Sequence, residues 1–306
     1  MVLRIFSVDG TKLSEIRKQQ FPLEGEIQRL TEANLQELFD LTFVKSEFEL
    51  HGLRIDTLAF DDESRGFVII EYKKDRNFSV VDQGMAYLNL MLNNKADFIL
   101  EYNESSRPSH SLKREEVDWS QSRVIFISPE FTKYQQHAIG FKDLGITLWE
   151  VHKYANGMLI FNEVKSPLSK EPIAAIAKNS TVARKLAREI KVYTEDDHLK
   201  SGNEIVKELY SELKSVILSL DKNIEIRPRK RYIAFHQKEN FVSFFILKSK
   251  LKTILNIRIN EINDPSKKAR NVPSFGGRLT FVEVQDRNEI PYTISLIKQA
   301  YEKTSL

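Results

Sequence analysis

The chain has 306 residues, of which 41% are hydrophobic and 29% are charged, a balance typical of globular proteins and not of disordered ones. It contains no cysteine, which excludes disulfides, thiolate metal sites and a cysteine nucleophile. The six histidines are scattered, so any metal ion is expected to have oxygen ligands. Without a signal peptide or an apolar run of ~20 residues, the sequence favours a cytoplasmic protein with no membrane partner.

Charge is distributed unevenly along the chain, although the net charge is only +3. Residues 1–165 hold 20 basic and 26 acidic residues, residues 166–194 hold 6 and 2, and residues 195–306 hold 20 and 15. A basic C-terminal half suits a polyanionic partner, but a small positive excess is also ordinary for a domain of this size. Composition alone therefore leaves nucleic-acid contact by that half open.

The first predicted elements are a hairpin and a helical segment. Residues 3–16 have the pattern of two strands, and Asp9-Gly10 is typical of the tight turn between them. From Leu23 to Phe39, leucines and one isoleucine recur near helical spacing, which predicts one amphipathic helix or two short ones.

Further along, helical and strand-like patterns alternate. The sequence predicts strands over 54–60, 67–73, 96–102, 123–128, 146–154 and 158–163, and helices over 82–92 and 131–141. Composition then changes at Ser166, where two prolines and several small residues indicate a linker.

The linker is expected to span residues 166–194 and to contain a short basic helix over 182–190. It would separate a first domain, residues 1–165, from a smaller α+β domain, residues 195–306. The elements expected in the second domain are helices over 198–220 and 290–301 and strands over 232–236, 241–247 and 251–259.

The strongest chemical pattern lies in the two strand-like runs that flank the polar loop 61–66. If this loop joins them as a hairpin, three pairs of residues face each other: Phe60 and Phe67, Leu58 and Ile69, and Asp56 and Glu71. Alternation along the strand puts Lys73 on the same face as Glu71. Like charges directly opposite in a sheet are destabilising, and a divalent cation offsets that cost. Two carboxylates with water ligands are typical of Mg²⁺.

The surroundings of this pair favour a functional site. Val68-Ile69-Ile70 is apolar on both faces, as in a buried central strand, and charge appears only where the strand ends. Ligands bind at strand ends in α/β sheets. The alternative is a surface hairpin in which Glu71 and Lys73 form a solvated ion pair. An isolated Glu-x-Lys favours that alternative, whereas the opposed Asp56 favours a site.

The helix predicted after the second strand adds two polar residues. Gln83 and Tyr87 are four residues apart and therefore lie on one helix face. Gln83 is near the helix start, where the chain returns across the sheet. An ordinary exposed residue of the first turn would have the same spacing, so both interpretations stay open.

Asp56, the triplet Glu71-Tyr72-Lys73, and Gln83 with Tyr87 together resemble the motifs of the PD-(D/E)xK nuclease superfamily, and more closely its RecB-like and NucS-like endonuclease branches. The resemblance covers roughly residues 23–152. The first motif strand, Gly52-Leu53-Arg54-Ile55-Asp56, is one residue longer than the compact form and has no proline before the aspartate. The C-terminal unit separately resembles an uncharacterised domain that is often appended to such nucleases.

The resemblance implies a restriction-endonuclease-like α/β fold, a mixed sheet flanked by helices, and a metal-dependent endonuclease that cuts nucleic acid, DNA rather than RNA. Asp56 and Glu71 would bind one or two Mg²⁺ or Mn²⁺ ions. Lys73 would orient the attacking water or stabilise the developing charge, and Gln83 would position water or phosphate. A homodimer is compatible with cutting two strands, but no residue demands it.

The resemblance also implies an acidic residue on the first helix. Glu26 is the expected residue, with Glu32 and Glu37 as alternatives. The residues expected to contact nucleic acid are Arg54, Lys74, Arg76 and Tyr87. For Arg54 a structural ion pair is the alternative to a phosphate contact.

In the second domain the segment 227–232 places four basic residues before a predicted strand, as either a nucleic-acid patch or a solvated strand entry. Phe241, Phe244 and Phe245 fit either stacking platforms or, more commonly, a core. Two other functions remain open for the whole chain. One is binding of nucleic acid without cleavage, and the other is a protein-interaction or regulatory module.

Overall fold

The structure is a computed structural model that describes residues 4–21, 23–74, 79–105, 111–139, 145–164, 181–272 and 278–305. The chain divides into two units, Met1–Val192 and Tyr193–Leu306. Among the described residues, no helix is both long and apolar enough to cross a membrane.

Counted over the described residues, the first unit is built on a seven-stranded mixed sheet. Its strands, in the order of pairing, are β3 (Lys18–Gln19), β8 (Ile146–Tyr154), β7 (Arg123–Ser128), β6 (Gly66–Tyr72), β5 (Leu53–Asp61) and β4 (Thr42–Leu50), with β9 (Leu159–Glu163) also paired to β8. β7 runs parallel to β6 and to β8, whereas β5 runs antiparallel to β6. The α/β class with a mixed sheet, expected from the sequence, is confirmed.

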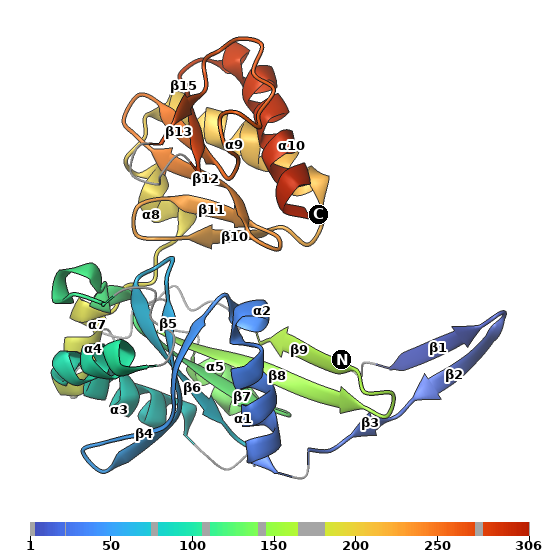
Figure 1. The fold of residues 1–306 in the computed structure, drawn as a ribbon, viewed down its shortest axis with the longest axis vertical. Helices are drawn as coiled ribbons and strands as arrows, with labels where there is room; N and C mark the ends of the chain where they lie inside the picture. The colour runs from blue at the N-terminus through green and yellow to red at the C-terminus, as the bar shows by residue number, and fades with distance from the viewer. Residues whose placement is uncertain are drawn as a thin grey trace. The chain divides into compact units, whose positions relative to one another are not determined.

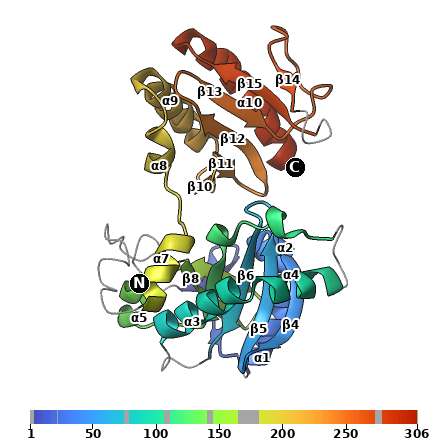
Figure 2. The same ribbon diagram turned by 90° about the vertical axis from the view of Figure 1, so that its left-hand side faces the viewer.

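Helices cover both faces of this sheet (Figures 1 and 2). They are α1 (Glu24–Ala33), α2 (Leu35–Phe39), α3 (Val80–Asn93), α4 (Lys95–Glu104), α5 (Lys133–Ala138) and α7 (Thr181–Glu189), with 3-10 turns η1 (Arg114–Glu116) and η2 (Trp119–Gln121). On one face Leu58 and Ile69 pack against residues of α3 and α4. On the other, Val68 and Ile70 pack against residues of α1 and α2. All of β6 is buried, as its continuous apolar run predicts.

Residues 96–102 form helix α4, so the strand expected there was wrong. Phe98 and Tyr102 are four residues apart and both point into the core, where Tyr102 packs on Phe60 with ring centroids 5.0 Å apart. Leu100, between them, is 57% exposed. The apolar run therefore has helical spacing in its buried positions, although an exposed leucine obscures it in the sequence.

Helix α7, which the sequence placed in the linker, packs on the first unit. Ala183, Leu186 and Ile190 are buried, and the last two belong to the core cluster on the α3 face. Their spacing is helical, so one apolar stripe explains both the helix and its attachment.

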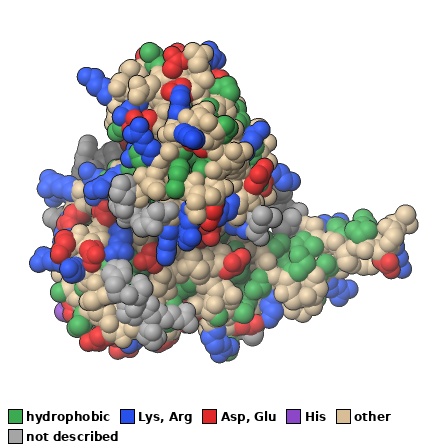
Figure 3. Space-filling view, turned by 45° about the horizontal axis from the view of Figure 1, so that its top comes forward, with side chains coloured by type: hydrophobic (Ala, Val, Ile, Leu, Met, Phe, Trp, Pro, Cys, Tyr) green, Lys and Arg blue, Asp and Glu red, His purple; other side chains and the backbone are tan. Residues whose placement is uncertain are grey.

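The predicted N-terminal hairpin is confirmed as β1 (Ile5–Asp9) and β2 (Lys12–Ile16), with Gly10 at φ +58° in the turn. It forms a sheet of its own and extends away from the rest of the first unit (Figure 1). Phe6, Val8 and Leu13 are exposed on it, and hydrophobic side chains are visible along this projection in Figure 3.

The second unit is α+β, as expected, with a six-stranded antiparallel sheet when counted over the described residues. Its strands are β10 (Glu225–Pro228), β11 (Ile233–His236), β12 (Asn240–Ile246), β13 (Leu251–Leu255), β15 (Thr280–Val284) and β14 (Arg270–Asn271), in the order of pairing. Its helices are α8 (Glu195–Leu199), α9 (Glu204–Leu220), η4 (Arg287–Glu289) and α10 (Ile290–Ser305).

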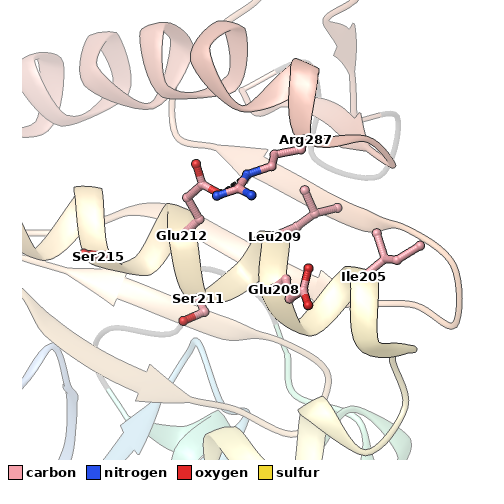
Figure 4. Close-up of a pocket in the computed structure, with 7 residues that line it drawn as sticks. All are labelled: Ile205, Glu208, Leu209, Ser211, Glu212, Ser215 and Arg287. Carbon is pink, nitrogen blue, oxygen red and sulfur yellow. Dashed lines mark hydrogen bonds and ion pairs between the residues drawn. The ribbon is translucent and has the colours of Figure 1, made fainter.

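Two sequence predictions for this unit need correction. The helix expected over 198–220 is divided, because the side chain of Asn203 caps the start of α9 by accepting from the Val206 backbone N–H. The sequence also missed β10, β14 and β15. On the helix side, Arg287 and α9 line a shallow pocket in which Arg287 pairs with Glu212 at 2.9 Å (Figure 4).

Candidate active site

The two motif strands pair in the predicted register up to the site. Phe60 faces Phe67, and the regular pairing of the two strands continues to Thr57 and Ile70. At the next residue, Asp56, a side chain and not the backbone bonds to the neighbouring strand. Its Oδ2 accepts a hydrogen bond from the backbone N–H of Tyr72 at 3.0 Å. The strands therefore end their regular pairing where the two carboxylates lie.

Glu71 is a buried carboxylate, 3% exposed, that is held by three side chains. Lys73 Nζ donates to its Oε1 at 2.6 Å, and Gln83 Nε2 donates to the same oxygen at 2.8 Å. The Tyr87 hydroxyl lies 2.9 Å from Oε2 and also 2.9 Å from the carbonyl oxygen of Arg54. Gln83 and Tyr87, the pair singled out by spacing, thus both reach the predicted site.

The start of α3 places these two side chains. Ser79 caps the helix by accepting from the Asp82 backbone N–H, which puts Gln83 in the first turn. Gly84 lets the helix approach the sheet closely, since a Cβ there would lie 2.3 Å from Cδ1 of Ile146. The cap and the close approach together bring Gln83 and Tyr87 to Glu71.

The electrostatics of the carboxylate pair fit a cation. Burial, and then the charge of Glu71, raise the pKa of Asp56 to about 6, against the Tyr72 N–H, Lys73 and Arg54, which lower it. A divalent ion would offset the repulsion between the two carboxylates. In the described part of the chain, His, Asp and Glu do not form a group of three or more possible ligands. Two carboxylates completed by water is the arrangement common for Mg²⁺.

A second polar network lies on the α1 face, behind the carboxylates. The Thr57 hydroxyl donates to Glu32 Oε1 at 2.6 Å and lies 3.2 Å from the hydroxyl of Tyr72. Gln28 Nε2 donates to the backbone oxygen of Asp56 at 3.0 Å. Because Thr57 follows Asp56 and Tyr72 follows Glu71, this network ties both motif strands to α1. Gln28 and Thr57 were not predicted as site residues from the sequence, although both lie on faces that point into the protein.

The first-helix glutamates do not lie as expected. Glu26 accepts from Lys153 Nζ on β8 at 2.5 Å, and Glu32 belongs to the network on the α1 face. Glu37 is exposed. The glutamate that reaches the end of β6 is Glu24, whose Oε1 accepts from the Lys74 backbone N–H at 2.6 Å. Glu24 and Glu26 share the first helical turn, so the sequence alone cannot distinguish them.

The expected nucleic-acid contacts are placed as follows. Arg54 pairs with Glu47 at 3.0 Å and stays more than half exposed, and Lys74 is exposed beyond the strand end. Arg76 lies outside the described residues. Tyr87 is only 3% exposed, so its expected contact with nucleic acid is replaced by its contact with Glu71.

Comparisons with known proteins give one match to a family model, one full-length relative and two partial structural matches. Residues 195–304 match a family described as a domain of unknown function, DUF5655. An uncharacterised protein of Haemophilus influenzae is 45% identical over 301 residues, which are 97% of this chain and 99% of that protein.

Two solved structures match about half of the chain. The EndoMS–dsDNA2 complex is 14% identical with a TM-score of 0.29 and covers 48% of this chain and 64% of that one. SfsA of Pyrococcus furiosus in complex with Ca²⁺ is 15% identical with a TM-score of 0.26 and covers 46% and 63%. Each match spans less than two thirds of the solved chain.

Proposed function

The chain belongs to the same family as the Haemophilus influenzae protein, and we propose that it is a metal-dependent phosphodiesterase that cuts nucleic acid. The observation that supports this proposal is the buried carboxylate pair. Asp56 and Glu71 lie where the ladder between β5 and β6 ends, and the Lys73 ammonium is 2.6 Å from Glu71. A structural ion pair between Lys73 and Glu71 does not need Asp56. Burial of Asp56 and the negative charge of Glu71 raise the pKa of Asp56, so its presence is costly.

The proposed ligands of the metal are Asp56 and Glu71. Mg²⁺ or Mn²⁺, when bound, lowers the pKa of a water ligand and offsets negative charge on phosphate oxygens. A carboxylate has about four lone-pair positions, and Glu71 uses three for its hydrogen-bond donors. Counted over the described residues, one lone-pair position on Glu71 is left for a cation.

Lys73 is the proposed electrostatic catalyst. Its ammonium has three N–H donors, and its hydrogen bond to Glu71 uses one of them. Within the described part of the chain, the other donors are available to orient a water molecule or to stabilise charge that develops on the phosphate. Gln83 and Tyr87 fix the Glu71 carboxylate, so they are positioning residues, and Lys74 is the proposed contact to the phosphate backbone.

A cleavage assay on a substrate panel tests this function. The purified chain is incubated with Mg²⁺ or Mn²⁺ and labelled single-stranded, duplex, flapped and modified DNA, and with RNA. We expect cleavage that EDTA abolishes, with DNA cut in preference to RNA.

Two variants, one within β5 and one just past its end, make the assay specific. Asp56→Asn keeps the shape of the side chain and is expected to lose cleavage. Asp62→Asn is the matched control, because Asp62 lies just past the end of β5 and accepts from the Thr42 hydroxyl at 2.7 Å. Equal cleavage by the Asp56→Asn variant contradicts the proposal. Binding of nucleic acid without cleavage of any substrate supports the non-catalytic alternative instead.

A further inference from the structure

The sheet of the second unit has one covered and one uncovered face among the described residues. α9 and α10 pack on the first, where Phe235, Phe244 and Val282 belong to the buried core. Strand alternation turns the intervening residues to the opposite face, and Phe245, Lys252 and Phe281 are only partly buried there. Phe241 and Phe244 are therefore core residues, whereas Phe245 is not.

Aromatic rings lie next to a basic side chain, Lys252, on the uncovered face, where Glu283 is the cross-strand partner of Lys252. Tyr232 and Phe245 have ring centroids 5.3 Å apart, tilted by 34°. On the other side of Lys252, the ring of Phe281 lies beneath its ammonium, with Nζ 4.1 Å from the ring centroid. Phe245 and Phe281 are thus partly exposed rings, and each has a π-contact with a neighbour on this face.

The strand register arranges uncharged residues between two arginines. Ala234, Ser243, Ile254 and Phe281 are successive cross-strand partners on β11, β12, β13 and β15. Arg227 on β10 pairs with Ala234, and Arg270 on β14 pairs with Phe281. The row therefore begins and ends with an arginine and has only uncharged side chains between them. Six strands about 4.8 Å apart make it roughly 24 Å wide.

We propose that this face, defined by Arg227, Tyr232, Phe245, Lys252, Arg270 and Phe281, binds single-stranded nucleic acid. Unpaired bases stack on aromatic rings, whereas the bases of a duplex have no free faces. Lys252 at the centre and Arg270 at one edge complement phosphates along an extended strand, while Arg227 at the other edge is paired with Glu225 at 3.0 Å. Residues 195–306 contain 20 basic and 15 acidic residues. This positive excess favours a polyanion as the ligand over an apolar peptide segment.

Stacking is tested by binding of the full-length chain to a fluorescein-labelled thymidine oligonucleotide in EDTA, followed by fluorescence anisotropy. Phe245→Leu and Phe281→Leu keep apolar volume but remove the ring, and each is expected to raise Kd roughly fivefold or more. Phe281→Trp keeps a stacking surface and is expected to keep the affinity. Circular dichroism melts confirm that each variant is folded.

Phosphate contact is tested by the salt dependence of the same Kd. Lys252→Gln and Arg270→Gln are each expected to reduce the slope of log Kd against log salt by about 0.7, the value for one phosphate contact on a single strand. Lys298→Gln is the matched control, because Lys298 is exposed on α10, which packs on the covered face. It is expected to leave both affinity and slope unchanged.

The inference is overturned if the chain does not bind the oligonucleotide, or if Phe245→Leu, Phe281→Leu and Lys252→Gln bind as the unchanged chain does. The latter result would make a protein segment the better occupant of this face. Because binding is measured in EDTA, the result is independent of cleavage. A chain that binds through this face but cuts nothing contradicts the proposed function only.

Discussion

At the scale of single residues, the ionised form of Asp56 is needed for the proposed function but lowers the stability of the fold. Its folded pKa of about 6 is raised from an ordinary value of 3.8, chiefly by burial and then by Glu71. A carboxyl group whose pKa is raised by folding binds protons more tightly in the folded state. It therefore contributes stability at pH values below 3.8 and loses that contribution as the pH rises through about 6.

The Asp56→Asn variant tests this sign. In EDTA above pH 7 the variant lacks the buried charge, so we predict a Tm several degrees above that of the unchanged chain. Asparagine also keeps an oxygen that can accept from the Tyr72 N–H. Well below pH 3.8, where Asp56 is protonated in both states, the two Tm values should converge. Thermal melts across this pH range that show a lower Tm for the variant at high pH contradict the assignment.

Lys73 is assigned to the chemistry and not to metal binding. We predict that Lys73→Ala abolishes cleavage, because its ammonium is the nearest positive charge to Glu71. Mn²⁺ affinity should change by no more than a few fold, since both proposed carboxylate ligands remain. Parallel cleavage and calorimetry separate the two effects, and a variant that still cuts removes Lys73 from its role.

At the scale of secondary-structure elements, the position of α3 depends on one glycine. A Cβ on Gly84 would meet Cδ1 of Ile146 at 2.3 Å and Cε2 of Phe126 at 3.4 Å. An added methyl group must therefore displace the helix or the isoleucine. Displacement of the helix would move Gln83 and Tyr87 away from Glu71, which couples packing to the site.

Gly84→Ala and a compensating substitution test that coupling. We predict that Gly84→Ala costs roughly 1–3 kcal/mol of stability, as overpacking does, and slows cleavage. Ile146→Val removes the Cδ1 atom, so the double variant should recover most of both. Full activity and stability in the single Gly84→Ala variant would show that α3 is not held by this contact.

The same scale explains which elements the sequence predicts and which it does not. A loop of fixed length sets the register of β5 and β6, so the pairing that leads up to Asp56 and Glu71 is a local property. The choice between Glu24 and Glu26 depends on how α1 lies against the sheet, which no local pattern encodes. Likewise, Leu100 looks like part of a strand until the packing of Phe98 and Tyr102 is known.

At the scale of the whole molecule, each unit has a hydrophobic core of its own. The sequence predicted that the N-terminal domain ends at residue 165. Helix α7 lies beyond that residue but packs on the first unit. The apolar stripe of α7 is visible in the sequence, whereas the core surface on which it packs is formed by residues far away in the sequence. The position of α7 therefore cannot be predicted from the stripe alone.

Separate cores predict separate unfolding. Leu296 on α10 is fully buried in the second unit, and Leu296→Ala should destabilise that unit by roughly 2–5 kcal/mol. Both tryptophans, Trp119 and Trp149, belong to the first unit. We predict that the circular dichroism melt moves to lower temperature while the tryptophan-fluorescence melt stays unchanged. A common shift in both signals contradicts independent units.

The most direct measurement of the central claim is calorimetric titration of the metal-free chain with Mn²⁺. We predict binding that strengthens as the pH rises through about 6, because the metal requires ionised Asp56. Asp56→Asn should weaken binding by about tenfold or more, and Asp62→Asn should leave it unchanged. No Mn²⁺ binding to the unchanged chain, or equal binding by Asp56→Asn, would contradict a metal site at Asp56 and Glu71.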